Sequence, residues 1–303
     1  MRNRPRVRWF LLSVFLLAGP LAAAPVRGDQ ATLRIGFSAD MFPEVSRKDA
    51  EIALLSWTKE IMRLASSPMA VKSVVHETGD DVAEAVLRRE LDVVGLTTPD
   101  YLRWKDRLQA IPRLVGDRGQ GPEEEYLLLV RQGGSIGQLR HLAGKRLLAP
   151  VGAPGLLSQE WLDVLLARQG LPETAKFFTE VRSISRPSQA ALPVFFRQAD
   201  AGIVTGAAFA TLQELNPQIG KDLVVLARSP KLLSSLMLFD KEASEAKRTL
   251  VTDSALRLAE TVTGKQVLLL FKISRVVPFG VSQLENVVAL MHEHAGLRVG
   301  RRS

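Results

Sequence analysis

The 303-residue sequence contains no cysteine. Disulfides, cysteine-based metal sites, a thiol nucleophile and a lipid-modified N-terminal cysteine are therefore all excluded. The sequence also has no lysine- and arginine-rich run long enough to form a stripe for nucleic acid, so we predict no nucleic-acid partner. These absences argue against a lipoprotein and against a nucleic-acid-binding protein.

Motifs for catalysis and for cofactors are missing as well. There is no Walker loop, and the carboxylates are scattered along the chain. His292 and His294 lie two residues apart in a predicted helix, so they do not share a face that could hold a metal ion. We predict no catalytic residue, no metal site and no cofactor.

The N-terminus has the three-part pattern of a secretory signal. Four arginines and no acidic residue precede the apolar run 9–18, and the small residues 21–24 follow the Gly19-Pro20 break. We predict that residues 1–28 are a signal peptide cut between Ala22 and Gly28; the alternative is an uncleaved N-terminal anchor. The signal holds five arginines, so its removal leaves 35 basic and 32 acidic residues, a net charge of +3.

After the signal, extended apolar segments alternate with amphipathic helical segments, which is typical of parallel βαβ units. Strands are predicted at 32–37, 70–76, 91–96, 110–115, 126–131, 145–151, 177–184, 201–205, 223–227 and 235–239. Helices are predicted at 48–64, with an apolar side that includes Ile52 and Leu55, and at 82–90, 156–169, 188–198, 206–215, 241–262, 263–272 and 281–296. A further helix is expected to begin with Thr98 as N-cap and Pro99 at its first position, and a loop is expected at 116–125.

The alternating series runs twice, which predicts two α/β lobes joined by two extended crossovers. The expected boundaries are 29–124 for the first part of lobe I, 125–235 for lobe II with the crossover segments, and 236–303 for the return crossover and the C-terminal helices of lobe I. Beyond Asp240 only helices are expected. The alternative is one long doubly wound sheet.

Five blocks of the sequence resemble a known family. They are LRIGFSADMFPE (33–44), DVAEAVLRRELDVVGLTTPDYLRW (81–104), LAGKRLLAPVGAPG (142–155), SQAALPVFFRQADAGIVTGAAF (188–209) and LVVLARSPKL (223–232). Their order and spacing are similar to those of the periplasmic phosphate/phosphonate-binding family of ABC-transporter solute receptors. The resemblance implies a two-lobed type II periplasmic-binding-protein fold, in which each lobe is a mainly parallel sheet flanked by helices and the ligand cleft lies between the lobes.

The resemblance also implies that four strand-to-helix loops face the ligand, because the carboxyl ends of parallel strands meet helix N-termini there. Thr98 could equally be a plain helix cap, Tyr101 a core aromatic residue and Ser188 a cap of the next helix. Tyr101 matches a ligand-contacting tyrosine of phosphonate binders. The candidate ligand residues on these loops are Ser38, Asp40, Phe42, Thr97, Thr98, Tyr101, Gly152, Gly155, Ser158, Arg186, Ser188 and Thr205.

Two of these loops depart from the family pattern. Phosphonate binders carry a hydroxyl-rich turn where this chain has residues 151–155, and Pro154 removes one N–H donor. They also place a carboxylate near the position of Thr205 to hold an amino group, and Thr205 supplies no such charge. The first departure argues against tight recognition of phosphate or phosphonate, and the second disfavours an aminoalkyl-phosphonate ligand.

The function expected from the sequence is that of a monomeric periplasmic solute-binding protein. It would bind a small anionic or polar solute, of a phosphate- or phosphonate-like class, by hinged closure of the lobes and deliver it to the membrane permease of an ABC transporter. Two alternatives remain open: a periplasmic ligand sensor that acts on a membrane receptor, and an enzyme built on the same fold.

Overall fold

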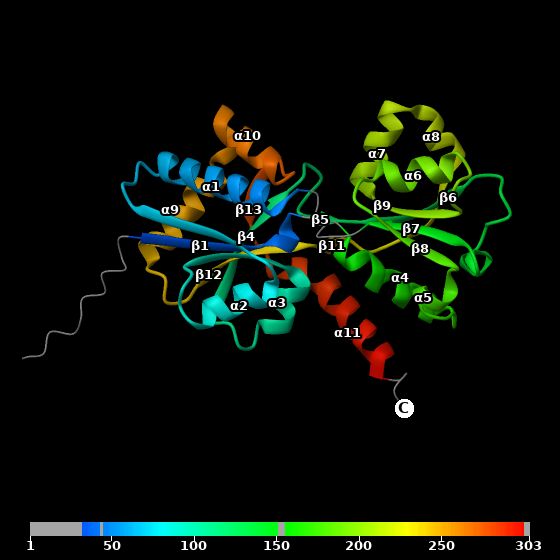
Figure 1. Cartoon of the computed structure of the whole chain (residues 1–303), viewed down its shortest axis with the longest axis horizontal. Helices are drawn as coiled ribbons and strands as arrows, with labels where there is room; N and C mark the ends of the chain where they lie inside the picture. The colour runs from blue at the N-terminus through cyan, green and yellow to red at the C-terminus, as the bar shows by residue number, and fades with distance from the viewer. Residues whose placement is uncertain (1–31, 43–44, 151–154, 300–303) are drawn as a thin grey trace, which may run out of the picture. The chain divides into compact units, whose positions relative to one another are not determined.

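A computed structural model describes residues 32–42, 45–150 and 155–299 of the chain. The described residues belong to one compact unit. They form two larger β-sheets, each flanked by helices (Figure 1), so the α/β prediction is confirmed and the alternative of a single long sheet is wrong. The predicted signal peptide and Gly152 lie outside the described residues.

The first sheet has six strands in the order β13-β4-β12-β3-β1-β2. Its strands are β1 (Thr32–Ser38), β2 (Ala70–His76), β3 (Val93–Thr97), β4 (Ala110–Asp117), β12 (Ser235–Asp240) and β13 (Arg275–Pro278). Strand β1 pairs in parallel with β2 and β3, whereas β12, β4 and β13 pair antiparallel with their neighbours. The prediction of helices alone beyond Asp240 is wrong, because the short Val276-Val277 run completes this sheet as β13.

Helices cover both faces of the six-stranded sheet (Figure 1). They are the 3-10 turn η1 (Ala39–Met41), α1 (Arg47–Leu64), α2 (Gly79–Leu87), α3 (Thr98–Trp104), α9 (Glu245–Leu256), the 3-10 turn η3 (Leu258–Glu260) and α10 (Val262–Leu270). Helix α2 begins earlier than predicted, because Thr78 and Asp81 form a capping box ahead of the apolar residues. Helix α1 buries Leu54, Trp57 and Ile61, whereas Ile52 and Leu55, predicted on its apolar side, are exposed.

The second sheet has five strands in the order β10-β6-β9-β7-β8. Its strands are β6 (Tyr126–Arg131), β7 (Arg146–Pro150), β8 (Glu180–Ile184), β9 (Ala201–Thr205) and β10 (Leu223–Arg228). Its helical elements are η2 (Leu139–Leu142), α4 (Leu156–Arg168), α5 (Thr174–Phe177), α6 (Ser188–Phe195), α7 (Gly206–Leu215) and α8 (Pro217–Asp222). The strand predicted from residue 177 begins only at Glu180, since Thr174–Phe177 close a helical turn that buries Phe177.

The two larger sheets are joined through a short antiparallel ribbon. Strand β5 (Glu123–Glu124) pairs with β11 (Leu232–Leu233), and the two strands lie on the chain's outward and return paths between the sheets. The loop predicted at 116–125 therefore contains the end of β4 and the whole of β5. The two extended crossovers expected from the sequence run side by side here.

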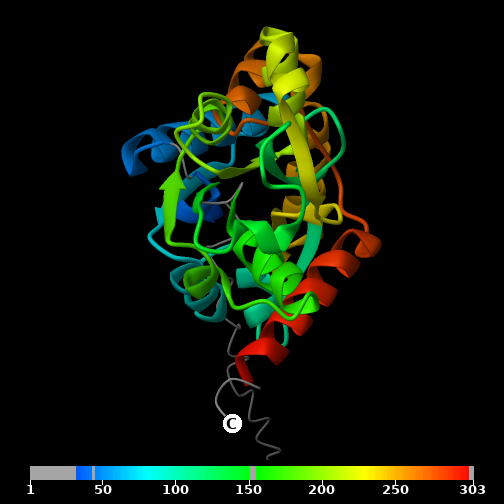
Figure 2. The ribbon, with the colours of Figure 1, turned by 90° about the vertical axis from the view of Figure 1, so that its right-hand side faces the viewer.

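The last helical elements, η4 (Val281–Leu284) and α11 (Glu285–Val299), follow β13. Helix α11 packs along α4, as the red and green helices of Figure 2 show, and Arg168 pairs with Glu293 at 2.6 Å between them. In contrast, α9 and α10 pack against α1. The predicted lobe boundaries stay predictions, but one C-terminal helix packs against a helix of the middle segment.

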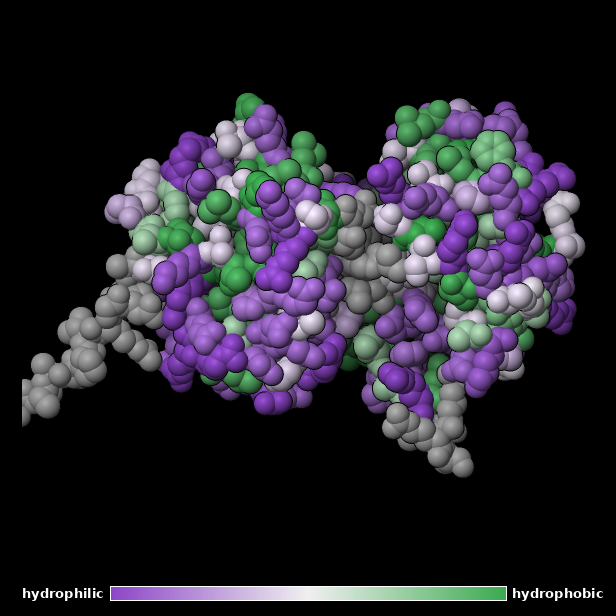
Figure 3. Space-filling view, in the orientation of Figure 1, coloured by the Kyte–Doolittle hydropathy of each residue, from purple (hydrophilic) through white to green (hydrophobic). Residues whose placement is uncertain are grey.

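Three clusters of buried apolar side chains fill the space between the sheets and their helices. One lies between the six-stranded sheet and α1, α9 and α10, and another between the five-stranded sheet and α6 and α7. The third continues from one sheet to the other through Leu232, Leu233 and Val287. On the face shown in Figure 3 most of the surface is hydrophilic, and exposed apolar side chains gather over α10, where Val262 and Leu269 are mostly exposed.

Candidate functional site

The ends of the parallel strands in both sheets lie beside the ribbon. Thr97, the last residue of β3, pairs with Ser235, which begins β12 just after β11. Thr205, the last residue of β9, pairs with Tyr126, which begins β6 just after β5. Each sheet therefore brings the carboxyl end of a parallel strand to the place where the chain crosses over.

The loop after β1 is held together by its own side chains. Ser38 is fully buried, and its hydroxyl accepts the N–H of Asp40 at 3.2 Å, which caps η1. The Asp40 side chain reaches the surface, and partial burial, reinforced by the nearby charge of Asp100, raises the pKa of its carboxyl. Phe42 lies in the core, with its ring centroid 5.2 Å from that of Phe271.

The loop after β3 corrects one prediction. The N-cap of α3 is Thr97 and not Thr98, because β3 ends at Thr97 and its hydroxyl accepts the N–H of Asp100 at 3.3 Å. The same hydroxyl donates to the Asp100 carboxylate at 2.5 Å. Pro99 is consequently the second helical residue.

Thr98, unlike Thr97, does not cap the helix. It is fully buried, and its backbone N–H donates to the carbonyl of Ser234 at 2.8 Å. Among the described residues its hydroxyl has no hydrogen-bond partner. A buried hydroxyl without a partner costs about 1–3 kcal/mol, so Thr98 is a polar group that the fold itself leaves unsatisfied.

Tyr101 is half-buried on α3 and packs against the core cluster that continues through the ribbon. Burial, followed by the charge of Asp106, raises the pKa of its hydroxyl. The hydroxyl is therefore neutral over the physiological range. Contact between Tyr101 and a ligand stays a prediction.

In the corresponding loop after β7, Gly155 is the N-cap of α4. A side chain at Gly155 would collide with the carbonyl of Pro150, so only glycine fits this turn. Ser158, predicted to contribute from the first helical turn, is fully buried and donates its hydroxyl to the Gly155 carbonyl at 2.7 Å. That bond holds the helix start together.

Arg186 is exposed in the loop after β8, and Ser188 is the first residue of α6. The N-cap of α6 is Pro187, so the interpretation of Ser188 as the cap is wrong. The Gln189 side chain accepts the N–H groups of Ser185 and Arg186 at 3.2 and 3.1 Å. Thr205 caps α7 by accepting the N–H of Ala208 at 3.3 Å, as Thr97 does for α3.

A surface hollow of about 750 Å³ adjoins several of these loops. Asp40 and Pro99 line it from the six-stranded sheet's loops, Glu160 lines it from α4, and α11 contributes His292 and His294. Burial raises the pKa of the Glu160 carboxyl, and the His294 charge opposes this shift in part. The hollow therefore brings two predicted ligand loops, those after β1 and β3, together with a helix of the other sheet.

The polar residues at the ribbon were not predicted from the sequence. The Arg118 guanidinium donates to the Glu124 carboxylate at 2.9 Å, and burial raises the pKa of Glu124 while Arg118 opposes the shift. Ser229 accepts the N–H of Tyr126 at 2.8 Å and so ties the two crossovers. The feature of the sequence that could have indicated them is the run of acidic residues directly ahead of the apolar strand that begins at Tyr126.

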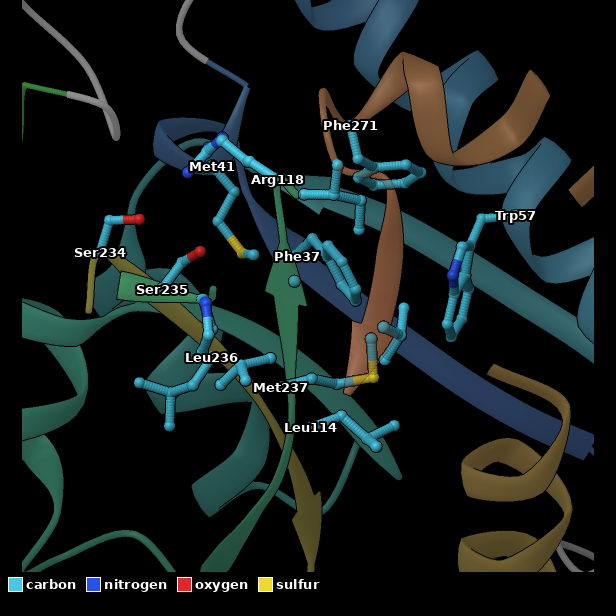
Figure 4. A pocket seen from close by; sticks show the side chains of 15 residues that line it. Phe37, Met41, Trp57, Leu114, Arg118, Ser234, Ser235, Leu236, Met237 and Phe271 are labelled. Atoms are coloured by element: carbon cyan, nitrogen blue, oxygen red, sulfur yellow. The ribbon is translucent and has the colours of Figure 1, made fainter. Parts of the chain in front are cut away.

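An apolar cavity of about 60 Å³ lies in the six-stranded sheet's half of the protein, close to the ribbon (Figure 4). Its lining residues are Phe37, Met41, Trp57, Leu114, Val115, Gly116, Arg118, Pro122, Ser234, Ser235, Leu236, Met237, Phe271, Ile273 and Val276. The described residues contain no group of three or more His, Asp or Glu side chains that could hold a metal ion. Within the same part of the chain, no helix has the length and apolar character needed to cross a membrane.

Comparison with solved structures identifies the fold. XAC2383 from Xanthomonas citri, bound to chloride, has 17% sequence identity and a TM-score of 0.62, with 89% of this chain and 99% of that chain covered. PhnD1 from Prochlorococcus marinus, in complex with methylphosphonate, has 16% identity and a TM-score of 0.60 over 88% and 98% of the two chains. A binding-protein component of an ABC phosphonate transporter from Pseudomonas aeruginosa has 15% identity and a TM-score of 0.59 over 88% and 87%.

These similarities show the two-lobed fold of type II periplasmic binding proteins, as predicted. A search among curated proteins finds no match. The sequence model of the family described as "ABC transporter, phosphonate, periplasmic substrate-binding protein" matches residues 57–284, which include strands of both sheets and the ribbon. Since that match covers most of the chain, the protein belongs to the periplasmic substrate-binding proteins of ABC phosphonate transporters.

Proposed function

We propose that this family member binds a small anion of the phosphate and phosphonate class between its two lobes and delivers it to an ABC permease. The observation that carries the proposal is the position of Thr97 and Thr205. Each ends a parallel strand, caps the helix that follows and pairs with the first residue of the strand that comes after the ribbon. Backbone N–H groups at such helix starts suit an anionic ligand, because the first turn leaves donors without partners inside the helix.

The relatives support the anionic class. PhnD1 was solved with methylphosphonate, and XAC2383 was solved with chloride and with ATP. All three ligands are anions. Thr205 carries no charge that could hold an amino group, so the proposal does not extend to aminoalkyl phosphonates.

Closure of the lobes over the ligand is the expected mechanism, with the β5–β11 ribbon as the hinge. The ribbon has only two residues in each strand, and Glu124 of β5 forms a mostly buried ion pair with Arg118. A short ribbon can absorb a change in backbone angles with little loss of packing. The ligand then shifts the population toward the closed state by the contacts that it makes only there.

We further propose that the mature protein is a periplasmic monomer without catalytic activity, and that its partner is the membrane permease. The family is one of transporter binding proteins. The N-terminal signal pattern supports export, and the absence of cysteine excludes a lipid anchor at the N-terminus.

Thermal unfolding with a panel of anions tests the proposal. Mature protein beginning at residue 29 is heated alone and with phosphate, phosphite, methylphosphonate, ethylphosphonate and sulfonates. A ligand at 100 times its Kd stabilises the folded state by about 2.7 kcal/mol, which corresponds to a rise in Tm of roughly 5 °C or more. Sodium chloride of equal ionic strength is the control. If no anion raises Tm above that control, the proposed ligand class is wrong.

A further inference from the structure

The cavity of Figure 4 combines an apolar interior with a polar rim. Phe37, Leu114 and Phe271 line the interior, and Trp57 closes the side opposite Ser234 and Ser235. Arg118 carries the only charge among the described residues that line it. The cavity therefore has one end suited to an apolar group and one end suited to a polar or anionic group.

The rim of the cavity lies beside the predicted ligand loops. Met41, which lines the cavity, directly follows Asp40 in η1. Ser234 accepts the N–H of Thr98 through its carbonyl, and Ser235 pairs with Thr97. An anion bound at these strand ends would therefore have the cavity next to it.

Arg118 gives the rim a charge that matches an anion. Its guanidinium has five N–H donors, and the bond to Glu124 uses one terminal nitrogen. Its side chain is one-quarter exposed, so solvent and solutes can reach it. No carboxylate lines the cavity among the described residues. A cationic amino group placed inside would be removed from water without a partner, which is strongly unfavourable.

We propose that this cavity binds the short alkyl group of an alkyl anion, with alkylphosphonates as the class, while the anionic head stays at the rim and the strand ends. The proposal rests on the proposed function and specifies its substrate. The cavity volume of about 60 Å³ leaves room for a few carbon atoms, and the flexible thioether of Met41 can adapt to their shape.

Isothermal titration with a homologous series tests the cavity. Methyl-, ethyl-, propyl- and butylphosphonate are titrated into the mature protein, together with 2-aminoethylphosphonate. Each buried methylene should lower Kd by roughly fourfold, so propylphosphonate should bind roughly 15-fold tighter than methylphosphonate. The gain should stop once the cavity is full, and 2-aminoethylphosphonate should bind more weakly than propylphosphonate.

Two substitutions at Met41 locate the effect. Met41→Trp fills the cavity and should reduce the propyl-to-methyl ratio of affinities to nearly one. Met41→Ala enlarges the cavity, so the gain in affinity with chain length should continue for at least one more carbon atom than in the unmodified protein. This variant keeps the test decisive if Met41→Trp does not fold. Leu215→Trp, at a mostly exposed position on α7, is the matched control and should keep the 15-fold ratio.

The outcomes separate the two proposals. If methylphosphonate binds but chain length has no effect in the unmodified protein, the alkyl site is overturned and the proposed function stands. An equal loss of chain-length dependence in Leu215→Trp and Met41→Trp also overturns the alkyl site. If none of the phosphonates binds, the proposed function is wrong, and the alkyl site that rests on it is overturned with it.

Discussion

Hydroxyl side chains at the strand ends bond to the backbone around them in this structure. Ser38, Thr97 and Thr205 each accept an N–H from the helical turn that follows, and Ser158 donates to the carbonyl of Gly155. These bonds hold the loops in place. Thr98 is different, because its buried hydroxyl has no partner among the described residues.

Substitution of the two adjacent threonines by valine should separate the cap from the unsatisfied hydroxyl. Thr97→Val removes the helix cap and should lower the free energy of unfolding by about 1 kcal/mol. Thr98→Val should leave it within about 0.5 kcal/mol of the original value or raise it, since no hydrogen bond is lost. Urea unfolding at pH 7 measures both. A larger loss for Thr98→Val would contradict this assignment of the cap.

At the scale of elements, the end of β4 depends on one buried carboxylate. Asp117 accepts the N–H groups of Gly119 and Gly121 at 2.7 and 2.9 Å, and both glycines have positive φ angles. It also pairs with Arg275 of β13 at 2.7 Å. Asp117 therefore connects the last strand of the sheet to the path that leads into the ribbon.

The pKa of Asp117 predicts how this connection responds to pH. Burial favours the neutral form, but the bonds from Gly119, Arg275 and Gly121 together outweigh it and lower the pKa below the ordinary value of 3.8. A lowered pKa in the folded state means that the stabilisation is complete above about pH 4 and is lost as the pH falls through the folded value. Asp117→Asn should thus cost roughly 1.5–3 kcal/mol at pH 7 and much less at pH 2–3.

Urea unfolding at both pH values checks this prediction, with Asp253→Asn on the exposed side of α9 as the control. The control should change the stability by less than about 0.5 kcal/mol at either pH. An equal cost of Asp117→Asn at pH 7 and at pH 2–3 would show that the carboxylate charge is not what stabilises this junction.

At the scale of the whole molecule, the two halves share more than the ribbon. The apolar cluster that contains Leu232 and Leu233 continues from one sheet to the other, and α11 pairs with α4 through Arg168–Glu293 and through His294–Asp163 at 3.4 Å. Closure of the lobes about the ribbon must either keep these contacts or replace them with others. The contacts of α11 are therefore part of the mechanical link between the lobes.

Export is also a property of the whole chain. When the 303-residue chain is produced in a Gram-negative host, we expect the protein in the periplasmic fraction to begin between residues 23 and 29, as measured by intact mass. Val14→Arg, which breaks the apolar run, should leave the protein uncleaved and inside the cell. A membrane-bound product that keeps residue 1 would instead support the uncleaved anchor.

Local sequence patterns predicted most of the helices and strands and the kind of protein. Near-continuous apolar runs such as 126–131 and 201–205 predicted strands, which are buried on both faces, and their alternation with helices favoured the two-lobed α/β class over a single long sheet. Local sequence patterns could not decide which of the adjacent residues Thr97 and Thr98 caps α3. The start of α3 depends on where β3 stops pairing with β12.

Only the tertiary structure decided what lies next to the strand ends. The ribbon pairs residues more than 100 positions apart, such as Glu124 and Leu232, and the apolar cavity brings together Met41, Gly116 and Ser234. Local patterns report periodicity and capping over a few residues, whereas a cavity is formed by the packing of β1, β4 and β12 against α1. For that reason the sequence alone indicated a binding protein, and the fold pointed to the place where an alkyl group of its ligand would fit.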